Sequence, residues 1–141
     1  MRGMTLTELL IVLVLVGLAA SIAVRPARRA LDRAAVDEGA LRYGALFETA
    51  RAIAVARGRH ARIELDTARS TAVITVQATS ARWDTVDQRP LGRAHVDASR
   101  TVATFSPLGV GSGVSNARII FTCGASADTL TIARTGRLKR F

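Results

Sequence analysis

One acidic residue near the start of the chain is the first candidate for chemistry. Glu8 lies in the stretch GMTLTELLIVLVLVGLAASIAV, between the apolar positions Met4–Leu6 and a run without charge from Leu9 to Val24. An ionised carboxylate at the centre of a bilayer costs about 2.5–3.5 kcal/mol, and intramembrane charges are usually paired and functional for that reason. The sequence therefore predicts that Glu8 has a partner of opposite charge.

The apolar stretch around Glu8 allows three interpretations. A secretory signal is the first, with Ser-Ile-Ala before Val24 as a cleavage site, although such signals have shorter apolar regions. A plain membrane anchor is the second, because about twenty apolar residues suffice to cross a hydrocarbon core, but it leaves Glu8 unpaired. In the third, residues 1–3 are a short basic leader. Cleavage after Gly3 then gives Met4 an α-ammonium four residues before Glu8, which can neutralise the carboxylate within one chain or between neighbours.

The third interpretation coincides with a family resemblance. The sequence GMTLTELLIVLVLVGLAA resembles the type IV prepilin motif, in which a glycine, a hydrophobic residue, a few small or apolar residues and a glutamate precede an apolar helix. The resemblance implies cleavage by prepilin peptidase after Gly3 and N-methylation of Met4, which replaces the commoner phenylalanine. It also implies that Glu8 helps to dock subunits into a filament.

The resemblance extends over nearly the whole chain. The segments ETARAIAVARGRHARIELD and FSPLGVGSG…ARIIF…LTIARTGRLK are similar to GspH/FimT-type minor pseudopilins. That family implies an α+β fold, with a long N-terminal transmembrane helix packed on a small antiparallel β-sandwich. It also implies low-copy subunits of a type II secretion pseudopilus or type IV pilus, often at the tip. The partners would be other pilins, prepilin peptidase and the inner membrane, with the C-terminal domain in the periplasm.

A cluster of basic residues bears on that orientation. Arg25, Arg28, Arg29 and Arg33 follow the apolar stretch and outweigh Arg2 before it. The positive-inside tendency alone favours a cytoplasmic C-terminal domain, which is the opposite of what the resemblance implies.

Four segments are expected along the chain. They are a leader over residues 1–3, a transmembrane helix over 4–25, an extension of that helix over 26–58 and a β-rich domain over 59–141. Pro26 should bend the helix and Gly58 should end it. Helical spacing predicts a core-facing stripe on the extension, and i,i+4 spacing predicts three ion pairs. The stripe comprises Tyr43, Leu46, Phe47, Ala50, Ile53 and Ala54, and the pairs are Arg28–Asp32, Arg33–Asp37 and Glu38–Arg42.

The β-rich domain begins with a clear alternating pattern. Residues 61–66 (ARIELD) alternate apolar and polar side chains and should pair as a hairpin with residues 71–78. Further strands are expected within 101–107, 117–122 and 128–134, followed by a Thr135-Gly136 turn and a C-terminal strand. The polar section 81–99 gives only a weak indication of structure.

The basic C-terminus RTGRLKRF suggests an alternative function in binding DNA. Alternation on a strand places Arg137 and Lys139 on one side and Arg140 on the other, with Arg134 near the turn. FimT-type pilins linked to DNA uptake end in a similar Gly-Arg-x-Arg, whose second arginine is Lys139 here. The competing interpretation is a solvated edge strand whose charge prevents edge-to-edge pairing. The net charge of +9 does not decide between DNA binding and a solvated edge strand. Nineteen of the twenty basic residues are arginine, and codon composition alone can produce such an excess.

Other motifs favour a structural protein over an enzyme, with no cofactor and no metal. Cys123 is the single cysteine, expected to be a small buried strand residue, and the two histidines lack zinc-site spacing. The glycines of GVGSGV (109–114) fit neither a dinucleotide nor a P-loop pattern and are expected to form a surface loop. Trp83 fits either an exposed contact or the core.

Overall fold

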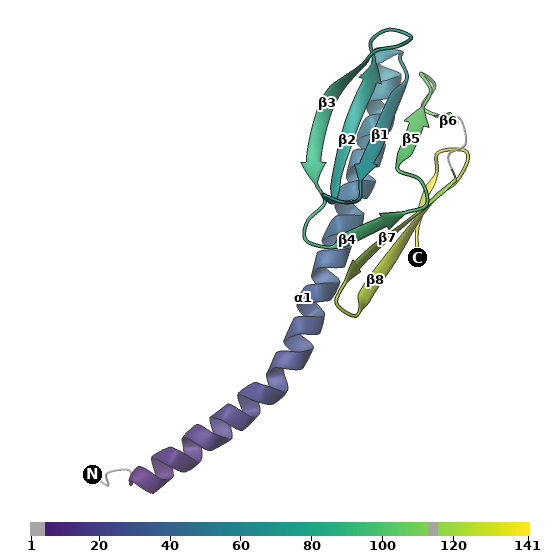
Figure 1. Ribbon diagram of the computed structural model, residues 1–141. Coiled ribbons are helices and arrows are strands. Elements are labelled where there is room, and N and C mark those ends of the chain that lie inside the picture. The colour runs from purple at the N-terminus through teal and green to yellow at the C-terminus, as the bar shows by residue number, and fades with distance from the viewer. Residues whose placement is uncertain (1–4, 113–115) are drawn as a thin grey trace.

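The computed structural model describes residues 5–112 and 116–141, and Figure 1 shows a long helix whose upper half lies against two antiparallel sheets. The helix is α1 (Leu6–Arg57), and the lower half of it extends away from the domain as a stalk. The strands are β1 (Ala61–Asp66), β2 (Thr71–Gln77), β3 (Trp83–Pro90), β4 (His95–Ala98), β5 (Val102–Phe105), β6 (Gly111–Ser112), β7 (Ala117–Cys123), β8 (Ser126–Ile132) and β9 (Leu138–Arg140).

Helix α1 is continuous through Pro26 and has a defined residue at each end. Thr5 is its N-cap, and Gly58 follows Arg57 with a left-handed φ of 60°, donating its N–H toward Ala54 and Val55. A glycine carries no Cβ and adopts this conformation without strain, which ends the helix. Figure 1 shows the helix curving between its lower and upper halves. Pro26 lacks a backbone N–H and lies in this curved stretch, which favours the bend.

The two halves of α1 have opposite burial. In the first half the apolar side chains are exposed, as at Leu13 and Val14, each 67% exposed. This half is long and apolar enough, by length and composition, to cross a membrane, and none of its most apolar window is buried. In the second half one face is buried against the sheets, and Phe47 there is fully buried. The predicted stripe is confirmed as core, with Ile53 packed at its margin.

The two sheets close over that buried face. The first has the strand order β3-β2-β1-β5-β6 and the second β4-β7-β8-β9, and every neighbouring pair is antiparallel. Phe47 of the helix meets Phe105 of the first sheet edge to face, with ring centroids 4.8 Å apart, and Tyr43 lies 6.4 Å from Phe121 of the second sheet. The predicted α+β fold, with a long helix on antiparallel sheets, is confirmed.

The strand predictions were right where apolar residues alternate and incomplete elsewhere. The predicted hairpin of β1 and β2 forms, with Ile63 opposite Ile74. The polar section 81–99 contains two strands that the sequence indicated only weakly. β3 lies at the edge of its sheet with most side chains exposed, and β4 buries a single valine, Val96. β3 lacks the alternation that marks a half-buried strand, and β4 alternates over only four residues.

The turn before the last strand is longer than predicted. A five-residue connection, Ala133 to Arg137, links β8 to β9 in place of a two-residue Thr135-Gly136 turn. The Gly136 N–H donates to the Ala133 carbonyl at 2.9 Å, and the Ala133 N–H donates to the Arg137 carbonyl at 2.8 Å. Gly136 is buried with φ 80°, and an added Cβ would lie 2.9 Å from the backbone nitrogen of Gly111. This close approach of two backbones, together with the positive φ, requires glycine at position 136.

Candidate functional site

Glu8 lies in the first turn of α1 and is bound to the residue that caps the helix. Its carboxylate accepts from the Thr5 N–H at 2.8 Å and from the Thr5 hydroxyl at 2.9 Å, while the Glu8 N–H donates to the Thr5 hydroxyl oxygen at 3.3 Å. This reciprocal capping box fixes the start of the helix. The contact was not predicted, although the Thr-x-x-Glu spacing is its signature. Gly3 and Met4, the predicted cleavage and modification sites, lie outside the described residues.

Two of the four acidic residues of the helix extension pair with the β-domain. Of the three predicted i,i+4 pairs only Glu38–Arg42 forms, at 2.6 Å, so the other two predictions are wrong. Asp32 lies 3.4 Å from Arg93, which follows β3, and Asp37 pairs with Arg140 of β9. Arginines of the β-domain approach the helix and bind the two aspartates in place of the helix arginines one turn away. These contacts tie the helix to both sheets.

Arg140 is the centre of this helix–domain contact. Its guanidinium pairs with Asp37 on the helix and with Asp128 on β8, and the side chain of Asp128 is only 9% exposed. Leu138, on the same side of β9, packs against the core. Arg140 therefore lies on the inner side of the last strand, with its charge compensated by two carboxylates.

The other predicted DNA-binding residues lie at the exposed edge of the second sheet. Arg134, Arg137 and Lys139 are all exposed. Arg137 forms no side-chain hydrogen bond or ion pair with any described residue, and the Lys139 ammonium lies 4.5 Å from the ring centre of Phe141. Lys139 and Arg140 are neighbours on β9 and point to opposite faces, and Arg137, which immediately precedes the strand, continues the alternation on the side of Lys139. The structure thus separates the four predicted residues into an outer group and one inner, paired residue.

Cys123 and Trp83 each have a defined neighbour. Cys123 is half-buried, where full burial was expected, and its sulfur lies 3.4 Å from an Asp32 carboxylate oxygen. Partial burial raises the pKa of the Cys123 thiol, the hydrogen bond and charge of Asp32 raise it further, and Arg93 opposes them. The thiol is therefore protonated at neutral pH. Trp83 is half-buried on β3, with the Arg62 guanidinium 4.2 Å above its ring, so it is a sheet-surface contact.

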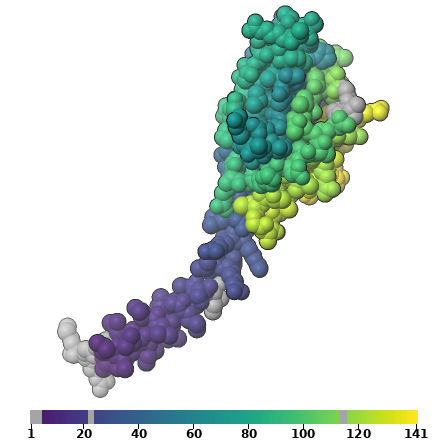
Figure 2. Space-filling model, in the orientation of Figure 1, coloured from purple at the N-terminus to yellow at the C-terminus, as the bar shows by residue number. Residues whose placement is uncertain are grey.

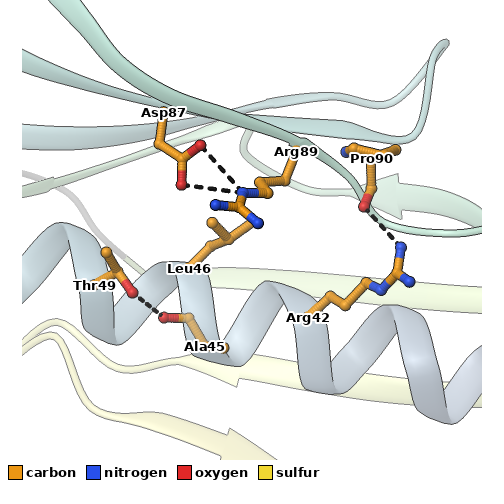
Figure 3. A pocket seen from close by; sticks show the side chains of 7 residues that line it. All are labelled: Arg42, Ala45, Leu46, Thr49, Asp87, Arg89 and Pro90. Atoms are coloured by element: carbon orange, nitrogen blue, oxygen red, sulfur yellow. Dashed lines mark hydrogen bonds and ion pairs between the residues drawn. The ribbon is translucent and has the colours of Figure 1, made fainter.

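An open groove of about 630 Å³ separates α1 from β3. Figure 3 shows its charged walls, with Arg42 on the helix and Asp87 and Arg89 on the strand. The Arg89 guanidinium contacts both Asp87 carboxylate oxygens, at 3.2 and 3.3 Å, and Arg42 donates to the Pro90 carbonyl at 3.3 Å. The charged groups of the groove thus form hydrogen bonds within its own lining, and none of these bonds involves a nucleophile. Within residues 5–112 and 116–141 no group of three His, Cys, Asp or Glu side chains is arranged to hold a metal ion.

The glycine-rich segment lies partly outside the described residues. Gly109 has a φ of 73°, and Gly111–Ser112 pair with β5 as β6. The surface-loop prediction is therefore wrong at Gly111–Ser112, because these residues form a strand at the edge of the first sheet. Gly113 and the two residues after it lie outside the described residues.

Comparison with solved structures decides the fold family. The chain aligns with the type IV minor pilin FimU of Pseudomonas aeruginosa PAO1 in two crystal forms, with TM-scores of 0.62 and 0.61 at 17% identity. These alignments cover 74% of this chain and 86% and 91% of the FimU chains. The minor pseudopilin EpsH from the type 2 secretion system of Vibrio cholerae aligns with a TM-score of 0.58 at 11% identity, over 74% of this chain and 96% of EpsH. The chain has the minor-pilin fold.

The sequence resemblance to GspH/FimT-type minor pseudopilins is thereby confirmed at the level of the fold. No family model matches the chain, and no curated protein matches it. In this chain the exposed apolar half of the helix lies outside the globular domain (Figure 2).

The Arg140 contact predicts a stability effect. Arg140→Met leaves the nearly buried Asp128 carboxylate without its guanidinium partner and removes the bridge to Asp37. We expect a loss of about 1–3 kcal/mol in the free energy of unfolding, measured by denaturant titration of the full chain in neutral detergent. The matched control is Arg89→Met, which removes an exposed pair with Asp87 and should cost at most about 1 kcal/mol. Equal losses in the two variants would contradict the structural role of Arg140.

Proposed function

We propose that the chain is a minor pilin or pseudopilin of a type IV pilus or type II secretion system. The observation that carries this proposal is the division of α1, which is apolar and exposed over its first half and packed on the sheets over its second. Such a helix places one half in a bilayer or in the apolar centre of a filament and leaves the folded domain outside. The fold shared with FimU and EpsH supports the same assignment.

The proposal includes processing and assembly at the N-terminus. Prepilin peptidase removes residues 1–3, and Met4 becomes the N-methylated first residue. Its ammonium is then four positions from Glu8 in the sequence. It can replace or supplement the two hydrogen bonds that the Glu8 carboxylate accepts from Thr5. In an assembled filament the same carboxylate pairs with the ammonium of a neighbouring subunit. Glu8 therefore serves first as a helix cap and then as an assembly contact.

The proposed setting follows from that role. The chain crosses the inner membrane once, with the β-domain in the periplasm, and joins other pilins at or near the filament tip. Its work is structural, and it requires no cofactor or catalysis.

The test of the assembly proposal is Glu8→Gln. Glutamine at this position still fits a capping box, so the helix start is retained while the charge is removed. We expect on the order of a tenfold loss of the subunit from sheared filaments relative to total cellular subunit, because an ammonium in the apolar filament centre loses its counter-charge.

The matched control is Glu48→Gln, which removes an exposed carboxylate from the same helix beyond the apolar half. It should enter filaments normally. Normal incorporation of the Glu8→Gln subunit would refute the assembly role of this carboxylate.

A second candidate function is DNA binding through the outer face of β9. Arg137 and Lys139 are exposed on that face, and Phe141 beside Lys139 is 70% exposed and available for stacking. Arg134 lies in the preceding turn and adds positive charge. The paired Arg140 is part of the helix–domain contact and does not belong to this surface.

The DNA candidate predicts a salt-dependent affinity that two residues control. We expect the full chain in neutral detergent to bind duplex DNA with an affinity that falls as salt is added. In the variant Arg137→Ala with Lys139→Ala, the plot of log K against log salt should be less steep by about 1.8, because two phosphate contacts are lost. The control variant Arg100→Ala with Arg118→Ala removes two exposed arginines elsewhere. Equal slopes for the two variants would exclude β9 as the binding surface.

A further inference from the structure

Three arginines form a ladder on one face of α1, directly after its apolar half. Arg25, Arg29 and Arg33 are spaced i, i+4 and i+8, which places them one above the other along the helix. All three are exposed. We call them the arginine ladder. Arg28, one turn from Arg25, adds a fourth charge beside it.

The arginine ladder is left without partners by the way the domain docks. Asp32 and Asp37, the acids one turn away, pair with Arg93 and Arg140 of the domain. Among the described residues the ladder side chains and Arg28 form no hydrogen bond or ion pair. Seven other arginines in the described part of the chain are paired with carboxylates: Arg42, Arg62, Arg69, Arg82, Arg89, Arg93 and Arg140. Exposed arginines without an ion pair also occur elsewhere in the described residues, but the ladder and Arg28 put four of them within nine consecutive positions of one helix.

The ladder has the correct height for phospholipid headgroups. The apolar part of α1, Leu6 to Val24, rises about 28 Å at 1.5 Å per residue, close to the thickness of a hydrocarbon core. Arg25 then begins the headgroup region. Helical side chains lean toward the N-terminus of their helix, so the guanidinium groups point back toward the bilayer.

The ladder also lines a space that can hold a headgroup. An open cleft of about 860 Å³ lies between the three arginines and the β7–β8 turn, at Ala125 and Ser126. Ala125 and Ser126 are small and uncharged, so the domain side of the cleft is neutral. The helix side carries the three arginines and one carboxylate, Asp37, whose charge is already paired with Arg140, so the positive charge prevails there. A phosphodiester that enters from the membrane meets several guanidinium donors, which match phosphate geometry.

We propose that the arginine ladder binds the phosphate groups of anionic phospholipids in the leaflet next to the β-domain. This inference rests on the proposed position of α1 in a bilayer. Position favours lipid over nucleic acid, because the ladder lies at the membrane end of the domain, directly above the apolar segment. Bound lipid phosphates hold the subunit at a fixed depth, with the domain above the surface.

The test compares lipids retained by the full chain. The chain in mixed micelles of neutral detergent, phosphatidylglycerol and phosphatidylcholine is examined by mass spectrometry of intact complexes. The ladder variant carries Arg25→Gln, Arg29→Gln and Arg33→Gln. The control carries Arg57→Gln, Arg100→Gln and Arg118→Gln, three exposed arginines away from the apolar half.

We expect the unmodified chain and the control to retain phosphatidylglycerol preferentially, and the ladder variant to lose that preference. The expected loss is roughly fivefold per arginine and on the order of a hundredfold for all three. Equal preference in the ladder variant and the control would overturn the proposal. So would full displacement of phosphatidylglycerol by soluble glycerol phosphate, which would indicate a site for free phosphate.

Three further outcomes distinguish lipid binding by the ladder from DNA binding and from an error in the position of α1. Loss of duplex DNA binding in the ladder variant, with lipid preference unchanged, would overturn the proposal in favour of a nucleic-acid surface. A chain that enters micelles but shows no lipid preference contradicts lipid binding by the ladder and leaves the membrane position of α1 intact. A chain that stays soluble without detergent contradicts the proposed membrane position of α1 as well.

Discussion

The structure depends on one constraint, which is that a single helix has an exposed apolar first half and a second half packed on the folded domain. Its first half exposes leucine and valine side chains on every side, and such a surface is unfavourable in water. Its second half exposes one face and buries the other, where Phe47 packs between the sheets. The folded domain is therefore built around the second half, and the helix runs without interruption from its exposed apolar half into the core.

The charges near the boundary follow from the same constraint. Carboxylates of the helix extension that could neutralise neighbouring arginines instead bind arginines of the domain, at Asp32–Arg93 and Asp37–Arg140. Those contacts connect the helix to segments far away in the sequence and leave positive charge where the apolar half ends. The ion pairs that dock the domain thus also determine the charge of the surface next to the apolar half of α1.

Features that depend on local sequence patterns were predicted, whereas contacts between residues far apart in the sequence were not. The stripe through Tyr43 and Phe47 was visible because core-facing residues recur with the helical period. Strand β3 gave a weak signal because an edge strand exposes most of its side chains. The partner of Asp37 could not be found locally, since Arg140 is 103 residues away and comes close only when β9 pairs with β8. The Thr5–Glu8 capping box, by contrast, had a readable signature that was not used.

The proposed function requires α1 to cross the membrane with the β-domain on the periplasmic side, although the arginines after the apolar half favour the opposite orientation. The most direct measurement places a cysteine at the exposed Ser80 in the β2–β3 loop, as Ser80→Cys with Cys123→Ala. Intact spheroplasts and lysed cells are then treated with a membrane-impermeant maleimide. A periplasmic β-domain predicts equal labelling before and after lysis. Labelling only after lysis would place the domain in the cytoplasm and contradict the proposed orientation.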